Sequence, residues 1–253
     1  MRRIAILLTA TACVASCTKQ TDTGSTRPDD VAPVAEPAGG EPVTPVPVEP
    51  EPKKDQRTLQ TEKCAEGNGE MCTSLGVMWE QGKEGAADVA KAREFYEKGC
   101  LANFDLGCSY FASVLDKGVG GPVDAAKARE LWAAQCDKGN VDDCLSAANS
   151  HEAVGTKADK ATARGLYSKA CTAGKQGGCS SEARLMMLGE GGAKDQKRAR
   201  SMFQAACDAG DATGCFNLAL AMEKGVGGKK DKAGAVAARA KACEAGNQLA
   251  CAK

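Results

Sequence analysis

A regular series of cysteine pairs constrains the fold of this chain more than any other feature. Twelve of the fourteen cysteines form pairs whose members lie eight residues apart, and successive pairs begin 36, 36, 35, 36 and 36 residues further on. The pairs are Cys64/Cys72, Cys100/Cys108, Cys136/Cys144, Cys171/Cys179, Cys207/Cys215 and Cys243/Cys251. A fixed period of this length is typical of an architecture built from stacked repeats.

Glycines and aspartates keep the same register and predict two helices in each unit. Residues that tolerate positive φ follow each first cysteine, just beyond a helix end: Gly67, Asn103, Gly139, Gly174, Gly210 and Gly246. A second turn is marked by Gly82, Gly118, Gly155, Gly189 and Gly225. Aspartates that can cap the next helix follow at Asp88, Asp124, Asp159, Asp195 and Asp231. Between these marks apolar residues recur at helical spacing, without strand alternation.

Small and bulky residues form further columns, which we interpret as helix-packing positions. The small columns are Gly76, Ala112, Ala148, Ala183 and Ala219, and Ala92, Ala128, Ala163, Ala199 and Ala235. The bulky positions are Phe95, Leu131, Leu166 and Met202, with Tyr96, Trp132, Tyr167 and Phe203 beside them. Small side chains let two helix axes approach closely, and the bulky ones then fill the groove as core rather than as a ligand-binding box.

The block from Cys207 to Ala219, followed by Glu223 to Gly228 and Asp231, resembles the Sel1-like repeat in its cysteine-rich form. This family is related to the tetratricopeptide repeat (TPR), and the likeness to the Helicobacter-type cysteine-rich secreted proteins spans residues 64–253. The chain is therefore expected to be all-α, an α/α solenoid (superhelix) of about five TPR-like helix-pair repeats plus a terminal half repeat, stapled by disulfides. Repeats would start near 64, 100, 136, 171 and 207, with a partial one from 243. The third unit is one residue short near Val154 to Lys157, and the last ends without a second helix.

The first quarter of the chain differs from the rest and indicates export. Arg2 and Arg3 precede a short apolar run, so residues 1–16 are predicted to be a signal peptide. The sequence up to Cys17 resembles a bacterial lipobox, which implies a lipidated Cys17 in the cell envelope; ordinary cleavage nearby would leave Cys17 a spare thiol. By the same resemblance, Thr18 rather than Asp favours the outer membrane. Residues 17–57 hold eight of the nine prolines and are predicted to be a disordered tether, and residues 58–253 form the repeat domain.

The twelve paired cysteines admit disulfides, metal sites or reactive thiols. An export signal indicates an oxidising compartment, where paired thiols become disulfides. Zinc knuckles use two to four intervening residues rather than seven, and one histidine cannot supply repeated ligands. Pairing within each eight-residue step suits the geometry of a turn between two helices, whereas pairing one repeat apart spans a whole helix pair.

Function is predicted from the architecture and the resemblance. The formal charge of zero argues against nucleic acid, and no nucleotide, metal or haem motif occurs, so no cofactor, small-molecule ligand or catalytic residue is expected. The expected role is a scaffold that binds protein partners, with membrane contact only through the lipid; a purely structural spacer is a further possibility. The enzymatic alternative is a weak penicillin-binding or β-lactamase-like hydrolase, as implied by cysteine-rich relatives. The S-x-x-K motif of that chemistry occurs only at Ser16 to Lys19, and His151 is interpreted as a partly buried structural residue.

Overall fold

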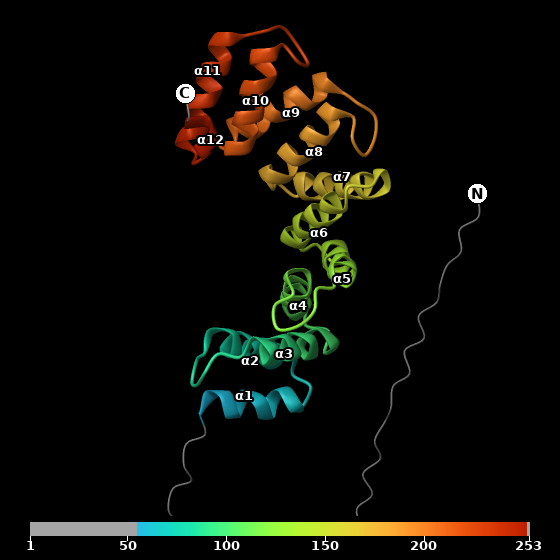
Figure 1. The fold of residues 1–253 in the computed structure, drawn as a ribbon, viewed down its shortest axis with the longest axis vertical. Coiled ribbons are helices and arrows are strands. Elements are labelled where there is room, and N and C mark those ends of the chain that lie inside the picture. Colours follow the sequence, from blue (N-terminus) through green and yellow to red (C-terminus); the bar gives the residue numbers. More distant parts are fainter. Residues whose placement is uncertain (1–54, 252–253) are drawn as a thin grey trace, which may run out of the picture. The chain divides into compact units, whose positions relative to one another are not determined.

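The protein is a series of helices packed in chain order, seen in a computed structural model that describes residues 55–251 (Figure 1). Within this range the chain has twelve helices and no strand. The helices are α1 (Gln56–Ala65), α2 (Gly69–Gln81), α3 (Val89–Leu101), α4 (Asp105–Lys117), α5 (Ala125–Asp137), α6 (Val141–Val154), α7 (Lys157–Thr172), α8 (Gln176–Leu188), α9 (Gln196–Asp208), α10 (Ala212–Lys224), α11 (Lys232–Glu244) and α12 (Gln248–Cys251).

Each helix packs mainly against its neighbours in sequence, which makes the array a solenoid of helix pairs. Five units follow one another, α2 with α3, α4 with α5, α6 with α7, α8 with α9 and α10 with α11. The first helices of successive units also touch, as α2 does α4 and α8 does α10. The predicted all-α solenoid is therefore confirmed. The array is flanked by α1, which occupies the place of a second helix, and by the short α12.

Side-chain caps and glycines define the helix ends as the sequence predicts. Asp88 accepts hydrogen bonds from the backbone N–H groups of Ala90 and Lys91, both at 3.1 Å, at the start of α3. Asp124, Asp195 and Asp231 cap α5, α9 and α11 in the same way. The first helices end at glycines in the left-handed region, with φ between 67° and 79° at Gly82, Gly118, Gly155, Gly189 and Gly225.

The shortened third unit departs from this pattern, so the capping role predicted for Asp159 is wrong. Thr156 caps α7 instead, and its hydroxyl accepts from the backbone N–H of Asp159 at 3.1 Å. One missing residue shortens the loop after Gly155. The other second helices begin one residue after their aspartate, whereas α7 begins at Lys157, three residues before that position. Asp159 then lies inside the first turn, where its Oδ1 is 2.9 Å from Nδ1 of His151. The His151 side chain is 20% exposed, which confirms a partly buried structural histidine.

The core consists of the predicted columns. The small residues at both columns are buried, and a Cβ on Gly76 would lie 2.7 Å from the ring of Tyr96, so this position has no room for a side chain. Tyr96, Trp132, Tyr167 and Phe203 are buried at between 0 and 7% exposure. In the neighbouring column only Leu166 is buried, and Phe95, Leu131 and Met202 are half-buried.

A second set of contacts joins three units to the loop of the unit that follows. Arg93, Arg164 and Arg200 donate from Nη1 to the loop carbonyl oxygens of Pro122, Ala193 and Lys229, at 2.9, 3.0 and 2.9 Å. Each arginine lies on the second helix of one unit, and each carbonyl lies in the turn of the following unit. The sequence analysis did not assign these arginines, although Arg57, Arg93, Arg129, Arg164 and Arg200 keep the repeat period.

The N-terminal predictions fall almost entirely outside the described residues. The signal peptide at residues 1–16, the lipidated Cys17 and the tether to residue 54 all lie there. The first described helix, α1, begins at Gln56, capped by Asp55, two residues before the expected start of the repeat domain at 58. Within residues 55–251 no helix has the length and apolar character needed to cross a bilayer.

Candidate functional site

The cysteine pairs lie at the joints between units. In each of the six pairs the Sγ atoms are between 1.94 and 2.04 Å apart and the Cα atoms between 4.3 and 4.9 Å. Each pair links the end of a second helix to the start of the next first helix, as Cys100 of α3 does with Cys108 of α4. The twelve cysteines are thus placed to hold the joints together rather than to form one reactive site. No metal-binding group of His, Cys, Asp or Glu occurs among residues 55–251.

Several of the cysteines predicted to form disulfides are core residues, and Cys72 and Cys215 are the most deeply buried of these. They are 2% and 1% exposed, and their Sγ atoms lie 3.5 Å from the carbonyl oxygens of Cys64 and Cys207, respectively. The alternative of a reactive thiol, left open by the sequence, disagrees with this burial, because a reactive cysteine has to be accessible. The eight-residue spacing predicts which cysteines are neighbours, but it does not report that these two side chains point into the packed interior. Neither Cys72 nor Cys215 can therefore contact a ligand or a partner directly.

One side-chain position on the second helices differs from one joint between units to the next. In chain order it holds Tyr96, Trp132, Tyr167, Phe203 and Arg239. The facing position on the first helix of the same unit holds Glu80, Asp116, Glu152, Met187 and Glu223. Four of these five pairs therefore combine a carboxylate with a phenol, an indole or a guanidinium. Only the fourth unit, with Phe203 and Met187, is apolar on both sides.

The two tyrosines close their joints. The hydroxyl of Tyr96 donates to Oε2 of Glu80 at 2.5 Å, and its ring stacks on Tyr110 of the next unit with centroids 5.0 Å apart. The hydroxyl of Tyr167 lies 3.0 Å from Oε2 of Glu152. Burial, assisted by the facing glutamate, raises the pKa of both tyrosines, so the phenols stay protonated and keep donating.

Arg184 adds a charged contact at the second closed joint. Its Nη2 donates to both carboxylate oxygens of Glu152, at 2.5 and 2.6 Å, across the gap between α8 and α6. Asn149 accepts from the Tyr167 hydroxyl at 2.5 Å in the same network. Hydrogen bonds therefore connect the phenol, the amide, the carboxylate and the guanidinium at this joint.

The joint at Trp132 is open and lined by charged, polar and apolar groups. A pocket of about 530 Å³ lies between α4, α5 and α6, and its lining includes Asp116, Arg129 and Asn149. Within it Ser150 donates to Oδ1 of Asp116 at 3.2 Å. Both signs of charge line this pocket, and its serines and amide can bind water.

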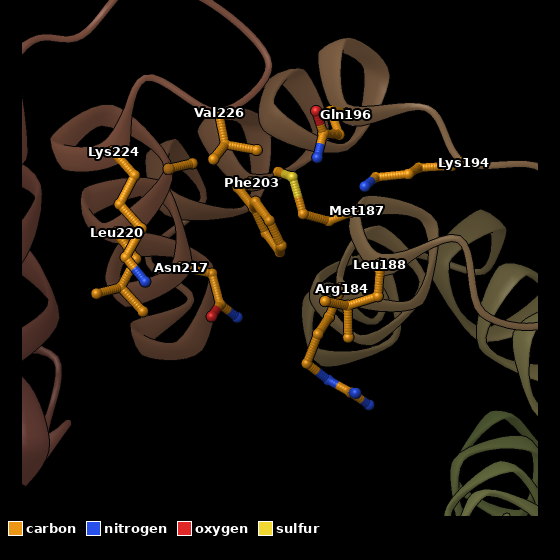
Figure 2. Close-up of a pocket in the computed structure, with 11 residues that line it drawn as sticks. Arg184, Met187, Leu188, Lys194, Gln196, Phe203, Asn217, Leu220, Lys224 and Val226 are labelled. Atoms are coloured by element: carbon orange, nitrogen blue, oxygen red, sulfur yellow. The ribbon is translucent and has the colours of Figure 1, made fainter.

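The joint at Phe203 is open and apolar, and we name it the α8–α10 pocket. It has a volume of about 330 Å³ and lies between the first helices α8 and α10, over α9 (Figure 2). Its apolar lining is Met187, Leu188, Phe203, Leu220, Ala221 and Val226. Its polar lining is Arg184, Lys194, Gln196, Asn217 and Lys224. No lining residue carries a carboxylate.

The side chains of this pocket form an apolar centre with cations at its edge. In Figure 2 the ring of Phe203 and the thioether of Met187 lie together in the middle, with Lys224 on one side and Lys194 on the other. Leu188 is 56% exposed, which is unusual for a leucine beside two core residues. This arrangement can bind an apolar group and attract negative charge around it, but it contains no nucleophile, acid or base pair for catalysis.

Sequence reasoning missed this pocket. It interpreted Phe203 only as core, which is right for the buried ring but incomplete. The signal was present in the repeat columns: Phe203 lacks the hydroxyl of the tyrosines, and Met187 lacks the carboxylate of every equivalent residue. Whether such a loss leaves a cavity depends on how the next unit packs, because Tyr110 fills the gap at the first joint and Asn217 leaves it open at the fourth.

The chain belongs to the Sel1 repeat family of helical repeat proteins. The family model for the Sel1 repeat matches residues 69–104, 100–140, 148–175, 183–211 and 212–247, which is more than half of the chain. Proteins of this kind generally act as scaffolds for protein–protein interaction, and the fold is typically non-enzymatic. No curated protein sequence matches the chain.

Two solved structures show the same fold. A protective antigen of uropathogenic Escherichia coli strains, described as having an SLR fold, is 23% identical with a TM-score of 0.67, over 77% of this chain and 42% of that one. A Sel1 repeat protein from Oxalobacter formigenes is 17% identical with a TM-score of 0.65, over 78% and 86%. The cysteine-rich protein B of Helicobacter pylori is 28% identical with a TM-score of 0.40, over 50% and 91%. The chain thus spans less than half the length of the E. coli antigen.

Proposed function

We propose that this protein is a scaffold that holds a protein partner outside the cytoplasm, and that the α8–α10 pocket is the contact site. The observation that carries the proposal is the open joint at Phe203 and Met187, where both facing residues are apolar and no carboxylate lines the pocket. The tyrosines at two equivalent joints are hydrogen-bonded to glutamates, and the pocket at Trp132 includes Asp116 in its lining. Exposed apolar surface with a polar rim is typical of a protein-binding site. The family's general role as an interaction scaffold supports the same conclusion.

An extracytoplasmic location is supported by the cysteine pairs. Six pairs at bonding distance suit an oxidising compartment, because disulfides are kept reduced in most cytosols. We further propose that Cys17 is acylated and tethers the repeat domain to the envelope through the proline-rich residues 18–54. Replacing Cys17 by Ser should abolish labelling with a radioactive fatty acid and release the protein from the membrane fraction. Labelling that survives Cys17→Ser would reject the lipid anchor but would leave the scaffold proposal intact.

The scaffold proposal is tested by capture with matched variants. Immobilised chain is exposed to envelope extract, and bound proteins are identified by mass spectrometry. Leu188→Gln removes an exposed apolar side chain from the pocket, and Leu101→Gln makes the same change at the last residue of another helix, where Leu101 is 76% exposed. We expect one partner to be retained by the wild type and by Leu101→Gln but lost with Leu188→Gln. Equal retention by both variants would reject the pocket as the contact site.

The hydrolase alternative has its own test. Its S-x-x-K motif at Ser16 to Lys19 lies outside the described residues, and no observation within residues 55–251 favours it. We propose a non-enzymatic role, so purified protein should not hydrolyse the β-lactam nitrocefin above a buffer blank. Turnover that disappears with a single serine substitution would establish the enzyme instead.

A further inference from the structure

We propose that the α8–α10 pocket binds an acidic segment of the partner, with one bulky apolar side chain inserted and carboxylates on either side of it. This inference rests on the proposed function, because it names the chemistry of the partner for the same site. It follows from the size of the pocket, from the sign of the charges around it and from what the neighbouring acidic residues already bind.

The centre of the pocket fits an apolar anchor. Phe203 is buried at 2% exposure, Met187 is half-buried and Leu188 is 56% exposed, so apolar surface passes continuously from the core to the rim. A volume of about 330 Å³ is at the small end of ordinary ligand sites, which suits one aromatic or branched side chain better than an extended ligand. Met187 adds adaptability, because an unbranched thioether can adjust to different anchors.

The cationic side chains at the edge of the pocket, its rim, favour a negatively charged ligand. Lys194 and Lys224 are exposed on opposite sides of the pocket, and Arg184 lies at its lower edge in the view of Figure 2. Arg184 is already paired with Glu152, so the two lysines are the cations that a ligand would meet first. A basic segment would place like charges together, and an acidic one would complement them.

Two acidic residues next to the pocket, Glu190 and Glu223, are paired with cations outside it. Glu190 pairs with Lys160 at 2.8 Å, and Glu223 pairs with Arg239 at 3.0 Å. Neither carboxylate lines the pocket. The pocket at Trp132 differs in this respect, because the carboxylate residue Asp116 is part of its lining. The absence of a lining carboxylate therefore distinguishes the α8–α10 pocket from the pocket at Trp132.

The probe for this proposal is a synthetic peptide. A fluorescein-labelled peptide carries a central phenylalanine between two runs of glutamate; one companion has lysine in place of glutamate, and another has glycine in place of phenylalanine. Fluorescence anisotropy with the full-length protein measures binding at low salt. The wild type should bind the first peptide. Both companions should bind at least about tenfold more weakly, because one lacks the carboxylates and the other lacks the apolar anchor; a factor of ten corresponds to about 1.4 kcal/mol.

Two double variants test whether the acidic peptide binds at the α8–α10 pocket. Lys194→Glu combined with Lys224→Glu reverses the rim, whereas Lys117→Glu combined with Lys157→Glu makes the same charge change on exposed lysines of α4 and α7. The first should weaken binding of the acidic peptide about tenfold, because each exposed ion pair contributes up to about 1 kcal/mol. The second should change it less than about threefold. Equal binding of the glutamate and lysine peptides, or an equal response to both double variants, would overturn the proposal.

The same variants separate this inference from the proposed function. A captured partner that is lost with Leu188→Gln but kept by the Lys194→Glu, Lys224→Glu variant would leave the scaffold function standing and reject an acidic ligand. A partner lost with both variants supports the two proposals together. If the acidic peptide binds in the pocket but no partner depends on Leu188, the scaffold function at this site fails while the charge preference holds.

Discussion

Arg93 of α3 reaches into the turn of the next unit, where its Nη1 donates to the carbonyl oxygen of Pro122 at 2.9 Å. The same contact recurs from Arg164 and Arg200, so arginines at the repeat period join the turns of three units to the second helix of the unit before. The cysteine pairs link the opposite ends of these helices. These three joints are thereby held at two places, at the disulfide turn and at the glycine-rich loop.

Replacing Arg93 by Ala should therefore destabilise the array. The loop carbonyl loses a charged hydrogen-bond donor, and we expect the free energy of unfolding to fall by about 1–2 kcal/mol. Chemical denaturation followed by circular dichroism measures the change, with Arg198→Ala, an exposed arginine of α9, as the control. An unchanged denaturation midpoint for Arg93→Ala would show that the contact is not held in solution.

Gly120 packs against the start of α3, the second helix of the preceding unit, and should not accept a side chain. A Cβ on Gly120 would lie 2.1 Å from the carbonyl oxygen of Val89, and the residue has a φ of +71°. Gly139 also has a positive φ, +100°, but open space around it. Gly139→Ala should cost about 1 kcal/mol through backbone strain alone, and Gly120→Ala should cost clearly more because backbone must also move. Equal losses from the two variants would contradict the close contact.

Much of this architecture could be predicted from the sequence because it repeats. The helix boundaries, the buried columns and the glycine turns each recur at the period of the cysteines, so one local rule explains several positions at once. The errors fall where a unit differs from the others. Asp159 does not cap α7, because the loop before it is one residue shorter than in the other units. The α8–α10 pocket lies where Met187 and Phe203 lack the polar groups of the equivalent residues. Both differences depend on loop length and on packing between neighbouring units, which the period of the sequence does not predict.

The pairing of the cysteines should be local in the exported protein. Peptide mapping without reduction should recover the six pairs that are eight residues apart. Removing the Cys171–Cys179 pair with two serines should lower the free energy of unfolding by about 2.5 kcal/mol, because the closed loop no longer restricts the unfolded chain. Recovery of pairs 36 residues apart, or of free thiols, would reject this pairing.

Asp143 should make stability depend on pH, and the sign follows from its surroundings. The carboxylate is buried at 5% exposure, and burial raises its pKa, with the charge of Asp142 adding to the effect and the hydroxyl of Ser109 opposing it. Because the folded pKa lies above the unfolded value of about 3.9, the folded protein favours the protonated form. Stability should therefore fall as pH rises through the unfolded pKa, and level off above the folded pKa.

Asp143→Asn removes this penalty while keeping an oxygen that can accept from Ser109. The variant should be more stable than the wild type near neutral pH, and the difference should shrink as the pH is lowered towards about 3, where both states of the wild type bind the proton. Asp137→Asn, at an exposed aspartate paired with Lys169, should change stability by less than about 0.5 kcal/mol at either pH. Denaturation midpoints across this pH range measure both variants. A stability gain from Asp143→Asn that grows on acidification would mean that the folded state favours the ionised carboxylate, which would be the opposite of what its burial implies.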